Sequence, residues 1–213
     1  MFGPFALCTL EGMAPPTAAR RQVLTDFRRN EIIAAALKVF GTKGFDAARA
    51  EDIAAQAGIA KGTLYLYFKS KEDIYAVAVQ HAIAQLAERV DDRLKLAKGL
   101  RARVSAYVFS RLEFWLEQKS LYRLVLTVGR EPQHRKQTAS VLREATRCLI
   151  SLYEEAAAAG EVKPQPFEAI AHAVLDMIRG ANERRLDGLA IHSVEEDAKF
   201  IIELALRQVG FEG

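Results

Sequence analysis

Apolar residues recur every three or four positions along most of the chain, a spacing that predicts helices. Strand-like alternation is hard to find, so the expected fold class is all-α. The clearest apolar stripe consists of Ile32, Ile33, Ala36, Leu37 and Phe40. It predicts a helix over residues 26–43 that begins with Asp26 as N-cap and ends at Gly44.

Two shorter helices are predicted next, over residues 50–57 and 61–68, with Gly58 in the turn between them. Leu64 and Phe68 are four residues apart and are expected to form the buried face of the second helix. Two short helices joined by a tight, glycine-containing turn are the layout of a helix-turn-helix, whose second helix enters the major groove of DNA. The second helix is therefore predicted to be a recognition helix.

The rest of the chain is also predicted to be helical. Ser70 is expected to cap a long helix that runs to about residue 95. The inward-facing residues expected on this helix are Ile74, Val77, Ala78, His81, Leu86 and Val90. Further helices are predicted over residues 101–118, 121–128, 132–159, 167–186 and 194–209.

The charged residues are unevenly distributed along the chain. Its 213 residues carry a formal net charge of +3. Residues 1–71 contain 10 Lys and Arg against 6 Asp and Glu, a net charge of +4, whereas the remaining residues contain 20 against 21, a net charge of −1. The positive excess therefore coincides with the helix-turn-helix pattern, as contact with DNA phosphates requires.

The composition of the chain and the absence of known motifs disfavour several other classes of protein. Half of the residues are apolar and 8% are aromatic, as in ordinary globular proteins, and no apolar run approaches the roughly 20 residues of a membrane span. Cys8 and Cys148 belong to no CxxC pattern and are expected to be free thiols in a reducing cytoplasm. The sequence has no GxSxG, Walker, HExxH or Rossmann motif, so we expect no enzyme, no cofactor and no metal site.

The stretch from Ala57 to Glu72, which reads AGIAKGTLYLYFKSKE, closely resembles the signature of the tetracycline-repressor (TetR) family. The resemblance covers about residues 28–75, and beyond it only the order and length of the helices agree. It implies a homodimer of about nine helices that binds double-stranded DNA at a pseudo-palindromic operator. It also implies repression of transcription, with release from DNA when an unknown small-molecule effector binds.

The chain is expected to divide into three parts. Residues 1–24, which include Pro4, Pro15 and Pro16, are expected to be a flexible N-terminal arm. Because Met13 opens a more ordinary start, residues 1–12 are expected to be an upstream extension or disordered. The resemblance implies a three-helix helix-turn-helix DNA-binding domain over residues 25–71. It implies a larger helical ligand-binding and dimerisation domain over residues 72–213, whose last two helices pair across a two-fold axis.

The resemblance also gives candidate DNA contacts by position, which are Lys61, Gly62, Thr63, Tyr65, Tyr67 and Lys71. Arg49 and Leu66 are added as candidates at positions that depart from the family pattern. Lys61 and Gly62 open the recognition helix, where an ammonium group and backbone N–H groups favour a phosphate, and Lys71 suits a second phosphate. Thr and Tyr hydroxyls donate hydrogen bonds to phosphates, and a Thr methyl packs on a thymine methyl.

Three positions depart from the family pattern. Ala60 replaces the Ser that usually caps the recognition helix, at a cost of about 1 kcal/mol. Ala48 and Arg49 replace a Thr-rich approach to the preceding helix, and Arg49 is expected to meet a phosphate directly. Leu66 cannot hydrogen-bond a base, so it is expected to contact a thymine methyl group or nothing.

Candidate pocket residues lie in the C-terminal part. They are Tyr107, Arg111, Phe114, Trp115, Tyr122, His172 and Asp176. Ordinary core packing is an equal alternative for the aromatic residues. We expect Arg111 to pair with an acid, with an acidic ligand as the alternative. The four-residue spacing of His172 and Asp176 suits metal ligation, but two ligands do not make a site, so a pocket or interface hydrogen bond is preferred.

The dimer interface is predicted on the eighth helix. Gly180 and Ala181 permit close approach of a second helix, and Arg184 and Arg185 are candidates for ion pairs between subunits.

Two functions remain open: a ligand-responsive regulator, or a DNA-binding structural or assembly protein that holds a protein partner without a small-molecule effector. A closed apolar cavity in the core would favour the first, and a filled core with an exposed apolar patch the second.

Overall fold

The computed structural model describes residues 18–129 and 135–211, which form nine helices and no strands. The helices are α1 (Ala18–Lys43), α2 (Ala50–Gln56), α3 (Lys61–Tyr67), α4 (Lys71–Leu96), α5 (Gly99–Glu117), α6 (Lys119–Val128), α7 (Arg135–Ala158), α8 (Glu168–Leu186) and α9 (Val194–Gln208). The all-α class expected from the sequence is confirmed.

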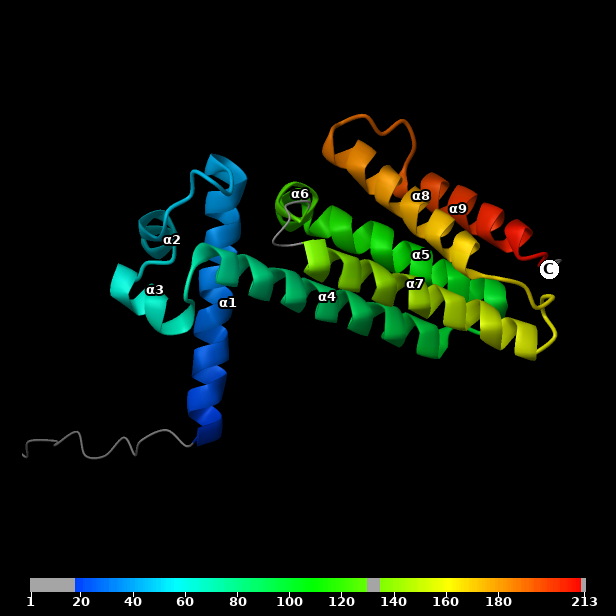
Figure 1. Cartoon of the computed structure of the whole chain (residues 1–213), viewed down its shortest axis with the longest axis horizontal. Helices are drawn as coiled ribbons and strands as arrows, with labels where there is room; N and C mark the ends of the chain where they lie inside the picture. Colours follow the sequence, from blue (N-terminus) through cyan, green and yellow to red (C-terminus); the bar gives the residue numbers. More distant parts are fainter. Residues whose placement is uncertain (1–17, 130–134, 212–213) are drawn as a thin grey trace, which may run out of the picture.

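Helices α1, α2 and α3 form a small N-terminal unit, in which α2 packs against both of the others (Figure 1). Leu64 and Phe68 are each 2% exposed, as their spacing predicted. Gly58 adopts a positive φ of 65°, and the Ile59 N–H donates to the Ala54 carbonyl at 3.0 Å. This Schellman turn ends α2 and sets the direction of the recognition helix.

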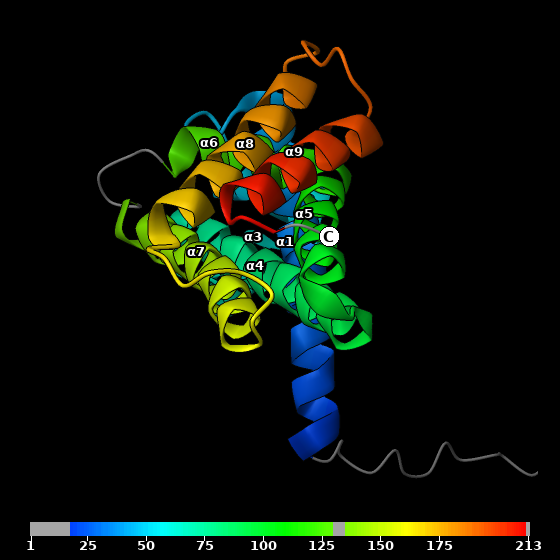
Figure 2. The same ribbon diagram turned by 90° about the vertical axis from the view of Figure 1, so that its right-hand side faces the viewer.

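Helix α1 starts earlier than the sequence indicated. It begins at Ala18, so the prediction of an N-cap at Asp26 was wrong, and residues 18–24 are helical rather than part of a flexible arm. The N-terminal part of α1 projects beyond the other helices (Figures 1 and 2) and exposes Val23, Leu24 and Phe27. A projecting helix buries no apolar stripe, so the pattern that identified the rest of α1 is missing here. Residues 1–12 lie outside the described part of the chain.

Helix α4 connects the two halves of the molecule. It packs against α1 and runs on against α5 and α6. Ser70 caps it as predicted, because the Ser70 hydroxyl accepts a hydrogen bond of 3.2 Å from the Asp73 N–H. His81 is exposed, so the prediction that it faces inward was wrong. Tyr75, which was not among the predicted inward residues, is 2% exposed.

The C-terminal bundle is arranged around α5, which packs against α4, α7, α8 and α9. Helices α8 and α9 lie side by side at its outer edge (Figures 1 and 2). The Arg185 guanidinium ties this pair together through an ion pair of 2.6 Å with Asp197. Both side chains are largely buried, at 8% and 15% exposure, so the contact fixes α9 against α8.

Candidate DNA-binding surface and core cavity

The recognition helix α3 presents most of its predicted contact residues to solvent. Tyr65 is 49% exposed and Leu66 is 82% exposed, while Thr63 is half-buried. A side chain added at Gly62 would meet nothing within 4 Å, so the surface there is open. Tyr67 packs partly against the core. These positions leave room for DNA, and the contacts themselves stay a prediction.

Lys61, the first residue of α3, is held by an ion pair within the domain. Its Nζ lies 2.5 Å from Oε1 of Glu51 on α2 and 5.9 Å from the centroid of the Tyr65 ring. The hydrogen bond to Glu51 raises the pKa of Lys61, and the same bond lowers the pKa of the Glu51 carboxyl. Glu51 therefore neutralises, in the free protein, the cation that is expected to meet a phosphate.

Lys71 is also engaged within the protein. Its ammonium donates hydrogen bonds of 2.9 Å and 3.0 Å to the carbonyls of Phe45 and Asp46, and it lies 4.7 Å from the centroid of the Phe45 ring. The side chain thereby fastens the start of α4 to the loop between α1 and α2. The predicted phosphate contact of Lys71 has to compete with this internal role.

In neither short helix of the motif does the side chain of the N-cap residue make a capping hydrogen bond. Ala60 is extended at the N-cap of α3 and makes no side-chain hydrogen bond, which confirms the predicted loss of the cap. Arg49 occupies the N-cap of α2, where its backbone N–H donates to the Asp52 carboxylate at 3.1 Å. The Arg49 side chain is exposed at the start of α2, and its contact with a phosphate stays a prediction.

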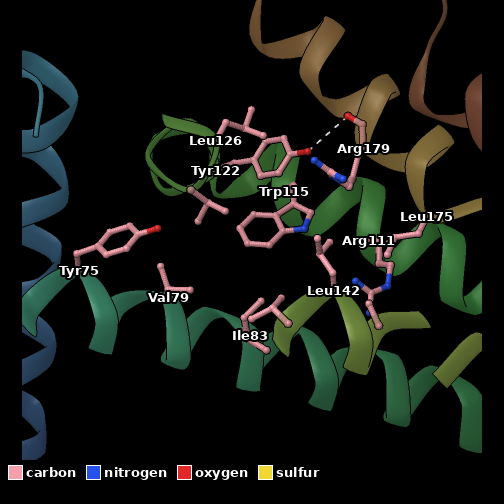
Figure 3. Close-up of a pocket in the computed structure, with 13 residues that line it drawn as sticks. Tyr75, Val79, Ile83, Arg111, Trp115, Tyr122, Leu126, Leu142, Leu175 and Arg179 are labelled. Atoms are coloured by element: carbon pink, nitrogen blue, oxygen red, sulfur yellow. Dashed lines mark hydrogen bonds between the residues drawn. The ribbon is translucent and has the colours of Figure 1, made fainter. Parts of the chain in front are cut away.

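Helices of the C-terminal part surround a partly open cavity of about 100 Å³, which we call the core cavity (Figure 3). Its lining residues come from α4 to α8 and are mostly apolar. They are Tyr75, Val79, Ile83, Arg111, Trp115, Tyr122, Val125, Leu126, Val141, Leu142, Ala145, Leu175 and Arg179. The Tyr122 hydroxyl donates a hydrogen bond of 3.4 Å to the Arg179 carbonyl, so α6 is tied to α8 across the cavity wall.

Three of the predicted pocket residues, Arg111, Trp115 and Tyr122, line the core cavity. Tyr107 and Phe114 are packed into the core, at 0% and 2% exposure, and do not line it. The Phe114 ring stands edge-on to the Trp115 ring, with centroids 5.2 Å apart. Ordinary core packing, the alternative for the aromatic residues, therefore describes Tyr107 and Phe114.

His172 and Asp176 lie on the outer face of α8, so their assignment to the pocket was wrong. Their side chains are 54% and 71% exposed. His172 Nε2 lies 3.8 Å from Glu168, and the Asp176 carboxylate lies 3.3 Å from Arg179. Spacing showed that the two residues share a helix face, but it does not show which face is turned inward.

Sequence reasoning missed the α4 side of the core cavity. Tyr75, Val79 and Ile83 follow one another at intervals of four residues and line it together. That spacing was the available signal, because residues four apart share a helix face. Arg179 on α8 was missed as well.

Arg111 does not form the ion pair that the sequence led us to expect. Among the described residues it has no carboxylate partner, and its buried Nε–H has no hydrogen-bond acceptor. Its guanidinium carbon lies 4.6 Å from the centroid of the Tyr107 ring. Burial raises the pKa of the Tyr107 hydroxyl, and the positive charge of Arg111 partly opposes that rise.

Two of the four interface candidates are occupied within the chain. Ala181 is 1% exposed and packs in the core, so its assignment to a subunit interface was wrong. Arg185 pairs with Asp197 of its own chain, so the expected ion pair between subunits was also wrong at this residue. Gly180 is half-buried and Arg184 is exposed, and both stay candidates.

The arrangement defines a helix-turn-helix protein in which one long helix joins the reading head to a bundle with an internal cavity. Within the described part of the chain, no helix is long and apolar enough to cross a membrane. Residues 32–78 match the family described as "Bacterial regulatory proteins, tetR family". This match confirms the resemblance of the N-terminal part of the chain to the TetR family, as its signature indicated.

Two relatives are similar over part of the chain. The HTH-type transcriptional activator FasR of Mycolicibacterium smegmatis is 33% identical over 100 residues, 47% of this chain and 46% of the relative. The fatty acid metabolism regulator protein of Bacillus subtilis is 42% identical over 65 residues, 30% of this chain and 34% of the relative. The matched segments thus span less than half the length of either relative.

Solved structures resemble the chain over most of its length. The fatty acid degradation regulator FadR from Bacillus halodurans has a TM-score of 0.77 at 19% identity, covering 87% of this chain and 97% of that one. FadR from Bacillus subtilis, solved in complex with stearoyl-CoA, has a TM-score of 0.75 at 22% identity, covering 83% and 96%. At these identities the likeness shows that the fold is shared across both halves of the molecule.

Proposed function

We propose that the protein is a sequence-specific transcriptional regulator, a homodimer that a small-molecule effector releases from a pseudo-palindromic operator. The double role of α4 carries the proposal, because this helix packs against α1 near the reading head and also lines the core cavity. A molecule that enlarges the cavity displaces α4 and changes the spacing of the two reading heads, which couples two distinct sites. The cavity favours this function over an assembly protein without an effector.

In this proposal α3 lies in the major groove. Thr63, Tyr65 and Leu66 face the bases and the adjoining backbone, and their exposure supports this placement. Lys61 and Arg49 meet phosphates, with Gly62 allowing close approach. Tyr67 contributes from the edge of the surface, since it also packs partly against the core. Lys71 supports this surface from inside the protein through its hydrogen bonds to the loop before α2.

The proposed dimer forms through α8 and α9. Phe200 on α9 is 66% exposed, and Leu189 and Ile191 in the preceding loop are 66% and 85% exposed, an apolar surface that a second copy would cover. Gly180 and Arg184 lie on the neighbouring helix. Sedimentation velocity should show a dimer for the native chain and a monomer for Phe200→Asp. A stable monomer of the native chain would contradict the proposal.

The effector is proposed to be a fatty acyl compound. The comparisons support this class, since they include a fatty acid metabolism regulator and a regulator solved in complex with stearoyl-CoA. The mainly apolar lining of the core cavity suits an acyl chain. Ligand pockets usually measure roughly 300–1,000 Å³, whereas the core cavity measures about 100 Å³. An acyl chain must therefore open the cavity as it binds.

Selection of binding sites from genomic DNA, followed by fluorescence anisotropy on the selected sites, tests the proposal. We expect a dyad-symmetric site and weaker DNA binding in the presence of acyl-CoA thioesters from octanoyl to stearoyl. Many unrelated sites and no response to these thioesters would favour the assembly protein. Because FasR is named an activator, transcription in vitro decides the sign of regulation.

The proposed regulator acts in the cytoplasm and catalyses no reaction, in line with the family that it resembles.

A further inference from the structure

We propose that Arg111 binds the anionic group of the effector, so that the effector is an apolar molecule ending in a carboxylate or a phosphate. This inference deepens the proposed function and rests on it. It starts from the position of one arginine between two cavities and from the fact that, among the described residues, no carboxylate lies within ion-pair distance of that arginine.

Arg111 borders the core cavity and a second one. The second cavity measures about 170 Å³ and lies between α4, α5 and α7. Both cavities share four lining residues, which are Ile83, Arg111, Val141 and Ala145. Arg111 therefore lies at the boundary between the two cavities.

The charge of Arg111 meets the face of the Tyr107 ring but no carboxylate within ion-pair distance among the described residues. A guanidinium group next to an apolar cavity is costly unless it is paired, and here its Nε–H is buried without an acceptor. Arg179, the other arginine that lines the core cavity, lies 3.3 Å from Asp176 and 3.9 Å from Glu183. Arg179 already has acidic partners, so Arg111 is the arginine that an anionic ligand would satisfy.

The surroundings of Arg111 also orient the ligand. The second cavity is also lined by two exposed acids, Asp91 and Glu144, which form no ion pair with Arg111 and would repel an anion placed in this cavity. On the other side, the core cavity extends from Arg111 past Trp115 to Tyr75, as Figure 3 shows. The anionic group is therefore held at Arg111, and the apolar chain occupies the core cavity toward the DNA-binding helices.

Trp115 provides a direct assay, because it is the single tryptophan of the chain and lines the core cavity. Its fluorescence is titrated with decanoate, decanoyl-CoA and the uncharged analogue decanol. We expect at least one anionic probe to bind about tenfold or more tightly than decanol, because a charge-assisted hydrogen bond is lost with the neutral analogue. Arg111→Gln should abolish that preference, and Arg111→Lys should retain part of it.

Arg103→Gln is the matched control, because Arg103 lies on the same helix but pairs with Glu155 at 2.7 Å and lines neither cavity. Its preference for the anionic probe should equal that of the native chain. A preference shown only by decanoyl-CoA identifies the phosphates as the anion, and one shared by decanoate identifies the carboxylate. The ratio of affinities within each variant removes any general loss of folding.

Equal affinity for decanol and both anionic probes, or an undiminished preference in Arg111→Gln and Arg111→Lys, would overturn the role of Arg111 and leave the proposed regulator intact. If no probe changes the fluorescence of the native chain, the acyl class of effector fails and this inference fails with it. Binding of the native chain to its selected DNA site is measured in parallel, so that a failure of DNA recognition is seen separately.

Discussion

The ring of Tyr75, in the wall of the core cavity, stands edge-on against the ring of Phe45 in the DNA-binding domain, with centroids 5.8 Å apart. Phe45 also contacts the Phe40 ring at 5.0 Å and holds the ammonium group of Lys71. A chain of contacts thus leads from the cavity to the loop before α2. Because close-packed rings have few alternative arrangements, a ligand that moves Tyr75 must disturb this chain.

Phe45→Leu should weaken the coupling between effector and DNA. The change keeps an apolar side chain but removes the contact with the Tyr75 ring, at a cost of about 1 kcal/mol in the free energy of unfolding. We expect the effector-induced loss of DNA affinity to shrink about threefold, within the range of about 0.5–2 kcal/mol seen for coupling mutations. The measurement is DNA affinity with and without decanoyl-CoA.

Phe167→Leu is the control for this change. Phe167 is 5% exposed and its ring lies 5.5 Å from Tyr153, so the substitution removes a comparable buried ring pair away from the DNA-binding domain. It should lower stability by a similar amount and leave the coupling unchanged. Equal loss of coupling in both variants would show that the Tyr75–Phe45 contact has no special role.

Lys71→Met separates an internal clamp from a phosphate contact. Loss of the hydrogen bonds to the carbonyls of Phe45 and Asp46 should lower the free energy of unfolding. The loss should be only about 1 kcal/mol, because the two hydrogen bonds are partly exposed to solvent. The salt dependence of DNA binding should stay the same. Unaltered stability with a salt slope reduced by about one would instead identify a phosphate contact. Lys69→Met, at an exposed neighbouring lysine, is the control for charge.

Sequence periodicity predicted the helices well where each one buries an apolar stripe. It placed α2 and α3 and identified Leu64 and Phe68 as buried, because two short helices in a fixed motif have few ways to pack. It failed at residues 18–24, where the helix projects and buries no stripe. Local pattern therefore predicts a helix through its packing and gives no signal where packing is absent.

The sites were harder to predict than the helices because a site depends on which face of each helix turns inward. Arg111 and His172 were both candidate pocket residues, yet Arg111 lines the cavity and His172 is exposed. Ion pairs posed the same difficulty. Arg185 was expected to pair across a subunit interface, but a partner 12 residues later in its own chain, Asp197, satisfies it. Spacing on one helix contains no information about such tertiary partners.

Glu51→Gln should strengthen DNA binding by releasing Lys61 for a phosphate. The lowered pKa of Glu51 means that the ion pair is present above the ordinary carboxyl pKa and is lost as the pH falls through the lowered value. The native chain and the variant should therefore differ at neutral pH, by about two- to tenfold in affinity at low salt, and converge in acid. Asp92→Asn removes a similar acid, paired with Lys95 far from α3, and should change little.

Ala60→Ser should restore the missing cap of the recognition helix. A Ser hydroxyl at this extended N-cap accepts a hydrogen bond from the first turn of α3, which stabilises the helix by about 1 kcal/mol. We expect modestly tighter DNA binding, a higher melting temperature and the same sequence preference, measured by anisotropy and thermal unfolding. Unchanged or weaker affinity would show that the absent cap does not limit recognition.

Leu66 is expected to make the DNA preference of this protein differ from those of its relatives. Because it is 82% exposed, Leu66→Ala should change stability by no more than about 0.5 kcal/mol. If Leu66 packs on a thymine methyl group, replacing that thymine by deoxyuridine should weaken binding of the native chain by about 0.8 kcal/mol, the value of one buried methyl-sized group. Leu66→Ala should bind both DNAs about equally. Equal binding of both DNAs by the native chain, at every thymine of the selected site, would mean that Leu66 reads no methyl group.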